Sequence, residues 1–265
     1  MLIDQENEPL HSTIILNPRT GKVQEFASDY PGIYSIDAPY RKWGRYAFTA
    51  TVYDSALTRV VYLANLPDTP SSKLNYAIWD LQANNMIADL ELIAWSVVEH
   101  GPVWSPTGNE FIVAYPESEE LDLNHILDEE LYSVSRNGEV AKLTNLSAYF
   151  RVGVDISHYS WAPDGRYVAF WMEPNPPAGL HDPHMELAVL DMASQEVTLF
   201  CIQGDFRHGG WAPVWSPNSQ QVMVKILDEA GIGEIAIVDI IHEVAFRVAG
   251  DLNPYGWMVT PPLTI

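Results

Sequence analysis

Three stretches of the chain line up without gaps, and they decide the fold. They read Pro102-Val103-Trp104-Ser105-Pro106-Thr107-Gly108, Tyr159-Ser160-Trp161-Ala162-Pro163-Asp164-Gly165 and Pro213-Val214-Trp215-Ser216-Pro217-Asn218-Ser219. A short apolar run follows each one, at residues 111–115, 167–171 and 222–226. Proline presets φ at the first turn position, and Gly, Asp or Asn suits the positions after it. Each stretch therefore predicts a tight turn between two antiparallel strands.

A second hairpin follows each of the three turns. Its strands are expected at residues 131–134 and 140–143, 187–190 and 197–200, and 235–238 and 244–248. Each repeat then holds four antiparallel strands, which we name a, b, c and d in chain order. Four such strands per repeat describe one blade of a β-propeller, so the sequence predicts an all-β propeller.

The repeats resemble those of TolB-type, WD-like β-propellers, whose blades carry a Trp-Ser-Pro-Asp-Gly turn. The resemblance is closest over residues 161–170 and good at Trp104 and Trp215, although Ser219 stands where the family has glycine. It implies a propeller whose relatives are largely non-catalytic and often periplasmic.

The pattern degrades toward both ends of the chain. Residues 44–48 resemble the start of a strand b, Tyr34 could replace the missing tryptophan of strand a, and residues 75–81 and 86–90 supply c and d. Residues 13–16 and 23–26 look like c and d strands, and residues 256–259 look like a strand a. We expect five blades in a single domain over residues 1–265, closed by pairing of N- and C-terminal strands, with residues 1–10 as a flexible lead-in. The alternative is a piece of a larger propeller.

The composition limits the classes of partner. The chain has 35 acidic and 14 basic residues, a formal net charge of −21. This charge argues against nucleic acid and anionic membranes, and would attract a basic protein surface or a cation. Solubility alone is the other reading of the charge. The sequence shows no signal peptide pattern and has a single cysteine, Cys201, and both features predict a cytoplasmic protein. Cys201 is expected to be buried at a strand end.

The order of strands in a blade sorts the loops onto two faces. The a–b and c–d turns are short and share one face, whereas the b–c and d–a segments are long and share the other, where function is expected. The b–c loop 117–130 carries seven acidic residues and no Lys or Arg: Glu117, Glu119, Glu120, Asp122, Asp128, Glu129 and Glu130. It is interpreted as a solvated charge run, a dock for a basic partner, or a calcium loop.

Two further features of the long loops are candidates for contact with a partner. Residues 174–185 are stiffened by prolines and hold His181, Asp182 and His184, which suit a rigid contact loop, an inert insertion or a metal. Trp211 falls outside the register of the strand-a tryptophans and could anchor a partner protein.

A third feature is the placement of His100, His158 and His208 in d–a segments, before the tryptophans of strand a. Imidazoles from successive blades could hold a metal at the channel mouth, with Asp155 or Asp205 behind them; the alternative is three unrelated loop histidines.

No catalytic motif is found, and no cofactor is expected. The favoured hypothesis is a non-catalytic scaffold that binds a protein through its acidic long-loop face. The alternative is an enzyme or metal-binding propeller of hydrolase or lactonase type, and a rigid spacer is the third.

Overall fold

The structure is a computed structural model. It describes residues 13–16, 23–26, 52–64, 75–83, 85–93, 101–116, 128–148, 153–174, 185–204, 211–227, 233–250, 252 and 254–257. These residues form four four-stranded antiparallel sheets and one two-stranded sheet, and in each large sheet the strands lie side by side in chain order. The predicted all-β class and the four-stranded blades are thereby confirmed. Residues 1–10 lie outside the described part.

The blades are numbered here by their place in the chain. Blade 1 holds β3 (Val52–Tyr53), β4 (Arg59–Ala64), β5 (Asn75–Asp80) and β6 (Asn85–Ile93). Blade 2 holds β7 (Val103–Trp104), β8 (Glu110–Pro116), β9 (Glu129–Ser135) and β10 (Val140–Lys142). Blade 3 holds β11 (Val154–Trp161), β12 (Tyr167–Pro174), β13 (Glu186–Asp191) and β14 (Val197–Gln203). Blade 4 holds β15 (Val214–Trp215), β16 (Gln221–Leu227), β17 (Gly233–Asp239) and β18 (Val244–Gly250).

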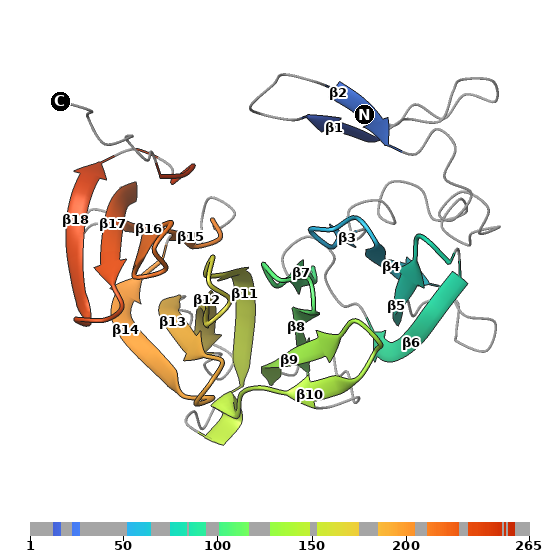
Figure 1. The fold of residues 1–265 in the computed structure, drawn as a ribbon. Helices are drawn as coiled ribbons and strands as arrows, with labels where there is room; N and C mark the ends of the chain where they lie inside the picture. The colour runs from blue at the N-terminus through green and yellow to red at the C-terminus, as the bar shows by residue number, and fades with distance from the viewer. Residues whose placement is uncertain are drawn as a thin grey trace, which may run out of the picture.

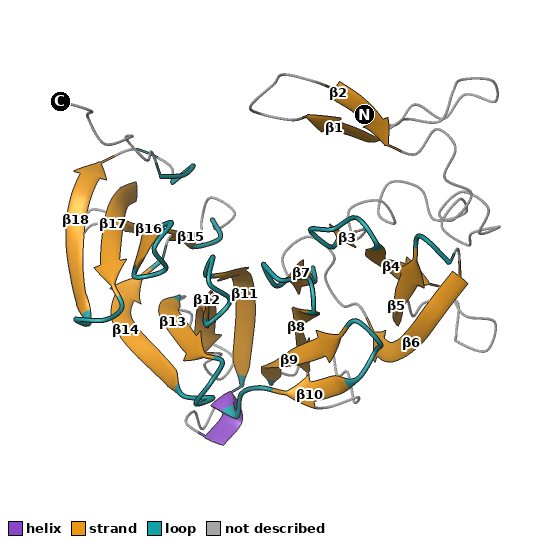
Figure 2. Cartoon of the chain, viewed as in Figure 1, coloured by secondary structure: helices purple, strands orange, loops and turns teal. Residues whose placement is uncertain are grey.

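Figure 1 shows the four blades as an arc, with β3, β7, β11 and β15 along its inner side and β6, β10, β14 and β18 along its outer side. In this view the two-stranded sheet of β1 (Thr13–Leu16) and β2 (Val23–Phe26) is drawn at the open side of the arc. The helical element of the described part is the 3-10 turn η3 (Leu146–Ala148), between blades 2 and 3 (Figure 2). It is far too short to cross a bilayer, and the described residues contain no helix that could do so.

The a–b turn has the same geometry in all four blades. Its fourth residue takes a positive φ, which is 55° at Leu57, 68° at Gly108, 74° at Gly165 and 59° at Ser219. The N–H of that residue donates to the carbonyl three residues earlier, at 2.9 to 3.0 Å. Glycine adopts this conformation without strain, whereas leucine and serine do not, so the surrounding blade holds them there.

The expected start of blade 1 is wrong. Strands a and b were predicted near Tyr34 and at residues 44–48, which lie outside the described residues, but the structure forms them at Val52–Tyr53 and Arg59–Ala64. The turn between them, residues 54–57, lacks the Trp, Pro and Gly of the other turns, so no local motif marks it. The predicted c and d strands of this blade are confirmed as β5 and β6.

The cores lie between neighbouring blades, where facing apolar side chains are buried. Full burial of such a side chain contributes about 1.5–3 kcal/mol, so this packing dominates the cohesion of the arc. Strand-a tryptophans add a repeated hydrogen bond from the indole N–H to a strand-a carbonyl of the preceding blade. The bonds are Trp104 to Val52 at 3.0 Å, Trp161 to Val103 at 2.9 Å and Trp215 to Ser160 at 3.2 Å.

Candidate functional site

The strand order places two kinds of surface at opposite ends of the blades. The a–b and c–d turns, which include Gly108 and Gly138, form the short-turn face. The long-loop face is the other end, where Pro116 ends β8, Glu129 begins β9 and Trp211 leads into β15. Most long loops, including Glu117, Glu119, Glu120 and Asp122, and also His181, Asp182 and His184, lie outside the described residues. The structure leaves their predicted roles untested.

The last two residues of the acidic run are not on the surface. Glu129 and Glu130 begin β9 and are 2% and 0% exposed, while Asp128 just before them is partly exposed. Glu130 accepts hydrogen bonds from the Thr144 hydroxyl at 2.5 Å and from the Leu146 N–H at 2.8 Å, and Lys142 lies 3.5 Å from it. It therefore fixes the connection from β10 to η3, which corrects its assignment to an exposed dock. A run of acidic residues in the sequence does not show which of them belong to the following strand.

Glu129 forms a carboxyl pair with Asp155 of β11, across the junction of blades 2 and 3. Its Oε2 accepts the backbone N–H of Ile156 at 2.8 Å. Burial, and then the charge of Asp155 and the hydrogen bond between the two side chains, raise the pKa of Glu129 to about 9. Glu129 thus keeps its proton at neutral pH.

The surroundings of this pair come from several strands. In the register of blade 3, Asp155 stands opposite Glu173 of β12. Tyr159, also on β11, is buried, and its hydroxyl donates to the Gly101 carbonyl at 2.8 Å and accepts the Ala114 N–H at 3.3 Å. Burial raises the pKa of Tyr159 well above its usual value, so it stays neutral. A pair of this kind can hold a proton between two blades.

Of the three histidines predicted to surround the channel mouth, only His158 lies in the described part, so the ring stays a prediction. His158 lies within β11 rather than in the preceding loop, at an irregularity between Ser157 and Ser160, with a φ of 49°. The sequence placed His158 in the loop because a strand a was expected to be short. β11 (Val154–Trp161) is much longer than β3, β7 and β15, the other described strands in position a. His100 and His208 lie outside the described residues. Among the described residues, no three His, Cys, Asp or Glu side chains gather to hold a metal ion.

An aromatic pair stands at the long-loop end of blade 4. The rings of Trp211 and Tyr255 meet edge to face, with centroids 5.3 Å apart and planes at 80°. The Trp211 carbonyl accepts the indole N–H of Trp171 at 3.0 Å, which ties this segment to blade 3. Tyr255 is 79% exposed, whereas Trp211 is partly buried. The sequence pattern pointed to Trp211 but not to Tyr255. The feature that could have indicated Tyr255 is its position two residues before Trp257, which belongs to the recurring tryptophans.

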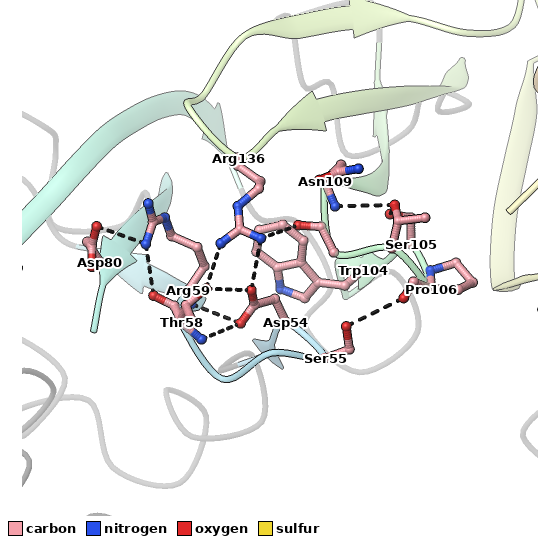
Figure 3. Close-up of polar contacts among 12 residues, drawn as sticks. Asp54, Ser55, Thr58, Arg59, Asp80, Trp104, Ser105, Pro106, Asn109 and Arg136 are labelled. Atoms are coloured by element: carbon pink, nitrogen blue, oxygen red, sulfur yellow. Dashed lines mark hydrogen bonds and ion pairs between the residues drawn. The ribbon is translucent and has the colours of Figure 1, made fainter. Parts of the chain in front are cut away.

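Sequence reasoning also missed a charged joint on the short-turn face (Figure 3). The Asp54 carboxylate accepts the Thr58 N–H at 2.7 Å, the Thr58 hydroxyl at 2.9 Å and the Arg59 N–H at 2.9 Å, and Arg136 lies 3.3 Å from it. Arg136, on the c–d turn of blade 2, also donates to the Gly108 carbonyl at 2.9 Å. With the Asp54 side chain fully buried and engaged, this joint fastens blade 1 to blade 2 and leaves no carboxylate for a ligand.

Cys201 is a further correction. It was expected to be buried at a strand end, but it is a free, exposed cysteine on β14, the outer strand of blade 3. Alternate residues of an outer strand face solvent, which a short apolar run in the sequence does not reveal.

Comparison with known proteins supports the fold and goes no further. No family model matches the chain, and no curated protein matches it. The solved structure of TolB from Acinetobacter baumannii superposes with a TM-score of 0.53 at 14% identity, over 90% of this chain and 48% of that one. An oligogalacturonate lyase in complex with manganese gives a TM-score of 0.50 at 13% identity, over 76% of this chain and 52% of that one.

The chain spans about half the length of these two structures. At such low identities the similarity supports the architecture alone. One of the two similar structures is a TolB protein and the other is an enzyme. Together with the four blades and the Trp-containing motif that recurs in three of them, this similarity shows that the chain has a TolB-like β-propeller fold.

Proposed function

We propose that the chain is a non-catalytic binding propeller that holds a partner protein on its long-loop face. The observation that carries the proposal is the Trp211–Tyr255 pair, because Tyr255 is 79% exposed and still held against a second ring. Aromatic side chains supply much of the binding energy at protein interfaces. A partner would present an apolar pocket to this pair.

The pair is ordered before any partner arrives. Trp211 is tied to blade 3 through its carbonyl and packs against Tyr255 through its ring. Side chains that are already fixed lose less conformational freedom on binding, so more of the contact energy appears as affinity.

The charge of the chain suggests the chemistry of the partner. A net charge of −21 favours a basic surface, and such binding weakens as salt screens the charges. Glu117, Glu119, Glu120 and Asp122 remain the proposed acidic contacts, with Asp128 partly exposed beside them, whereas the buried Glu129 and Glu130 drop out. The loop with His181, Asp182 and His184 remains a proposed contact segment.

The test uses three baits in parallel, namely the wild type, Tyr255→Ala and the matched control Ile241→Ala. Ile241 is 54% exposed but lies on the c–d turn of blade 4, at the opposite face. Capture from the protein's own host at low salt should give a stoichiometric partner with the wild type and the control. Tyr255→Ala should weaken its binding at least tenfold, which is about 1.4 kcal/mol. Equal binding by all three baits would contradict the proposal.

A second candidate is an enzyme or cation-binding propeller, and the Glu129–Asp155 pair between blades 2 and 3 favours it. Paired carboxyls with a shared proton can act in acid–base chemistry, or exchange the proton for a cation. His158 lies three residues beyond Asp155 on the same strand, and His100 and His208 belong to this candidate from the sequence. It predicts that Mn²⁺ or Ca²⁺ raises the unfolding temperature of the wild type and not of Glu129→Gln. If neither ion changes the unfolding temperature of the wild type, the pair does not bind a cation and this version of the candidate is wrong.

A cytoplasmic location belongs to the same proposal. An exposed free thiol, as at Cys201, suits a reducing compartment. Fractionation of host cells tests it, and recovery of the protein outside the cytoplasm would contradict it.

A further inference from the structure

Among the described residues, one face of blade 4 is more exposed than the same face of the other blades. In blades 1 to 3, the paired residues at the middle of strands b and c on this face are at most 9% exposed: Val61 and Ile78, Ile112 and Ser133, Ala169 and Val189. These faces pack on the next blade along the chain. The equivalent residues of blade 4, Met223 and Ile237, are only partly buried.

The outer strand of blade 4 extends this apolar face. Phe246 stands opposite Ile237 and is 55% exposed. The residues at its position in blades 1 to 3 are Ala88, Ala141 and Thr198. Val244 and Val248 of β18 are 41% and 57% exposed. Large apolar side chains grouped on one sheet face indicate a surface that another segment covers.

The chain itself begins the covering blade. The indole N–H of Trp257 donates to the Val214 carbonyl of β15 at 3.0 Å. This is the bond that Trp104, Trp161 and Trp215 make to the preceding blade. Trp257 therefore occupies the strand-a position of a fifth blade, next to the exposed face of blade 4.

The β1–β2 pair has the features of a c–d hairpin. Its strands are antiparallel, and the sequence that joins them, Leu16-Asn17-Pro18-Arg19-Thr20-Gly21-Lys22-Val23, has the length and pattern of Leu190-Asp191-Met192-Ala193-Ser194-Gln195-Glu196-Val197. In blades 1, 3 and 4 the c–d turn starts at an aspartate whose Oδ1 accepts two backbone N–H groups: Asp80, Asp191 and Asp239. Asn17 occupies that position in the sequence, and asparagine supports the same turn.

We propose that β1–β2 is the c–d hairpin of a fifth blade that begins at Trp257, and that this blade covers the Met223, Ile237 and Phe246 face. The occupant is this chain's own N-terminal segment. Figure 1 draws β1–β2 at the open side of the arc, between blades 1 and 4. The proposal stands apart from the proposed function, because it concerns the side of blade 4 and not the long-loop face.

The test is cross-linking in the full chain. Cys201→Ser removes the one native cysteine. Phe246→Cys is then combined with Ile14→Cys, Ile15→Cys or Leu16→Cys, and a short bismaleimide is added to dilute protein. Val248→Cys replaces Phe246→Cys if the latter fails to fold. The matched control is Leu199→Cys, at a residue of β14 that is 41% exposed on blade 3.

The proposal predicts a cross-link within one chain, for alternate positions of β1, because neighbouring residues of a strand face opposite sides. The Leu199→Cys control should give none. Cross-linked dimers would overturn the proposal in favour of a second copy on this face. Absence of any cross-link at all three positions, with both thiols reactive toward a monofunctional maleimide, would also overturn it.

Discussion

Replacing Glu129 by glutamine should abolish a specific loss of stability at rising pH. Glu129 is 2% exposed, and its pKa is raised to about 9 from 4.5. Between these two pH values the folded chain holds a proton that the unfolded chain has released. The stability that depends on this proton is therefore fully present below about pH 4.5. It is lost progressively as the pH rises toward 9, the pKa of Glu129 in the folded chain.

The magnitude follows from the linkage of one proton. Each pH unit within this window costs about 1.4 kcal/mol, so the cost at pH 7 is about 3 kcal/mol relative to pH 4.5. Glutamine has no proton to retain, and its side-chain oxygen can still accept the Ile156 N–H that Glu129 accepts at 2.8 Å. The variant should thus gain stability over the wild type as the pH rises.

Urea unfolding of both proteins from pH 5 to 9 measures this difference directly. The difference in free energy of unfolding should grow by about 1.4 kcal/mol per pH unit over most of the range. Glu139→Gln is the matched control, since Glu139 is exposed in the next turn of the same blade. Parallel curves for Glu129→Gln and wild type would refute the assignment of a retained proton to Glu129.

Two further substitutions test the joints between blades. Asp54→Ala should lower the free energy of unfolding by about 3 kcal/mol in urea titration, because it removes the buried carboxylate that binds Thr58, Arg59 and Arg136; a loss no greater than that of Glu139→Ala would count against the joint. Gly138→Ala should cost about 1–3 kcal/mol, because φ is 88° there and a Cβ would overlap that of Ala88 on β6. Gly250→Ala, where a Cβ meets nothing within 4 Å, is its control and should cost far less.

The blades that the sequence predicted are those with strong turn chemistry. Trp104, Trp161 and Trp215 each precede a proline-containing turn, and their packing between blades and their hydrogen bonds follow from that local pattern. Blade 1 lacks this local pattern. Tyr53 and Asp54 replace Trp and Ser, and Leu57 adopts the positive φ that glycine adopts elsewhere. Only the surrounding tertiary contacts reveal this turn.

The candidate site was less predictable because its parts are far apart in the sequence. Glu129 and Glu130 looked like members of a solvated run, yet their partners Ile156 and Leu146 lie 27 and 16 residues further along. Burial and pKa depend on such contacts, which the sequence does not show. Trp211 was found as an aromatic outside the repeat register, whereas its exposed partner Tyr255 became visible only through the ring contact.

Hydrogen exchange on the protein with its captured partner tests the central claim most directly. Binding through the long-loop face predicts slower exchange in residues 211–214 and 252–257 on complex formation, with the c–d turns 192–196 and 240–243 unchanged. Protection confined to those turns, or none around the Trp211–Tyr255 pair, would contradict binding through the long-loop face.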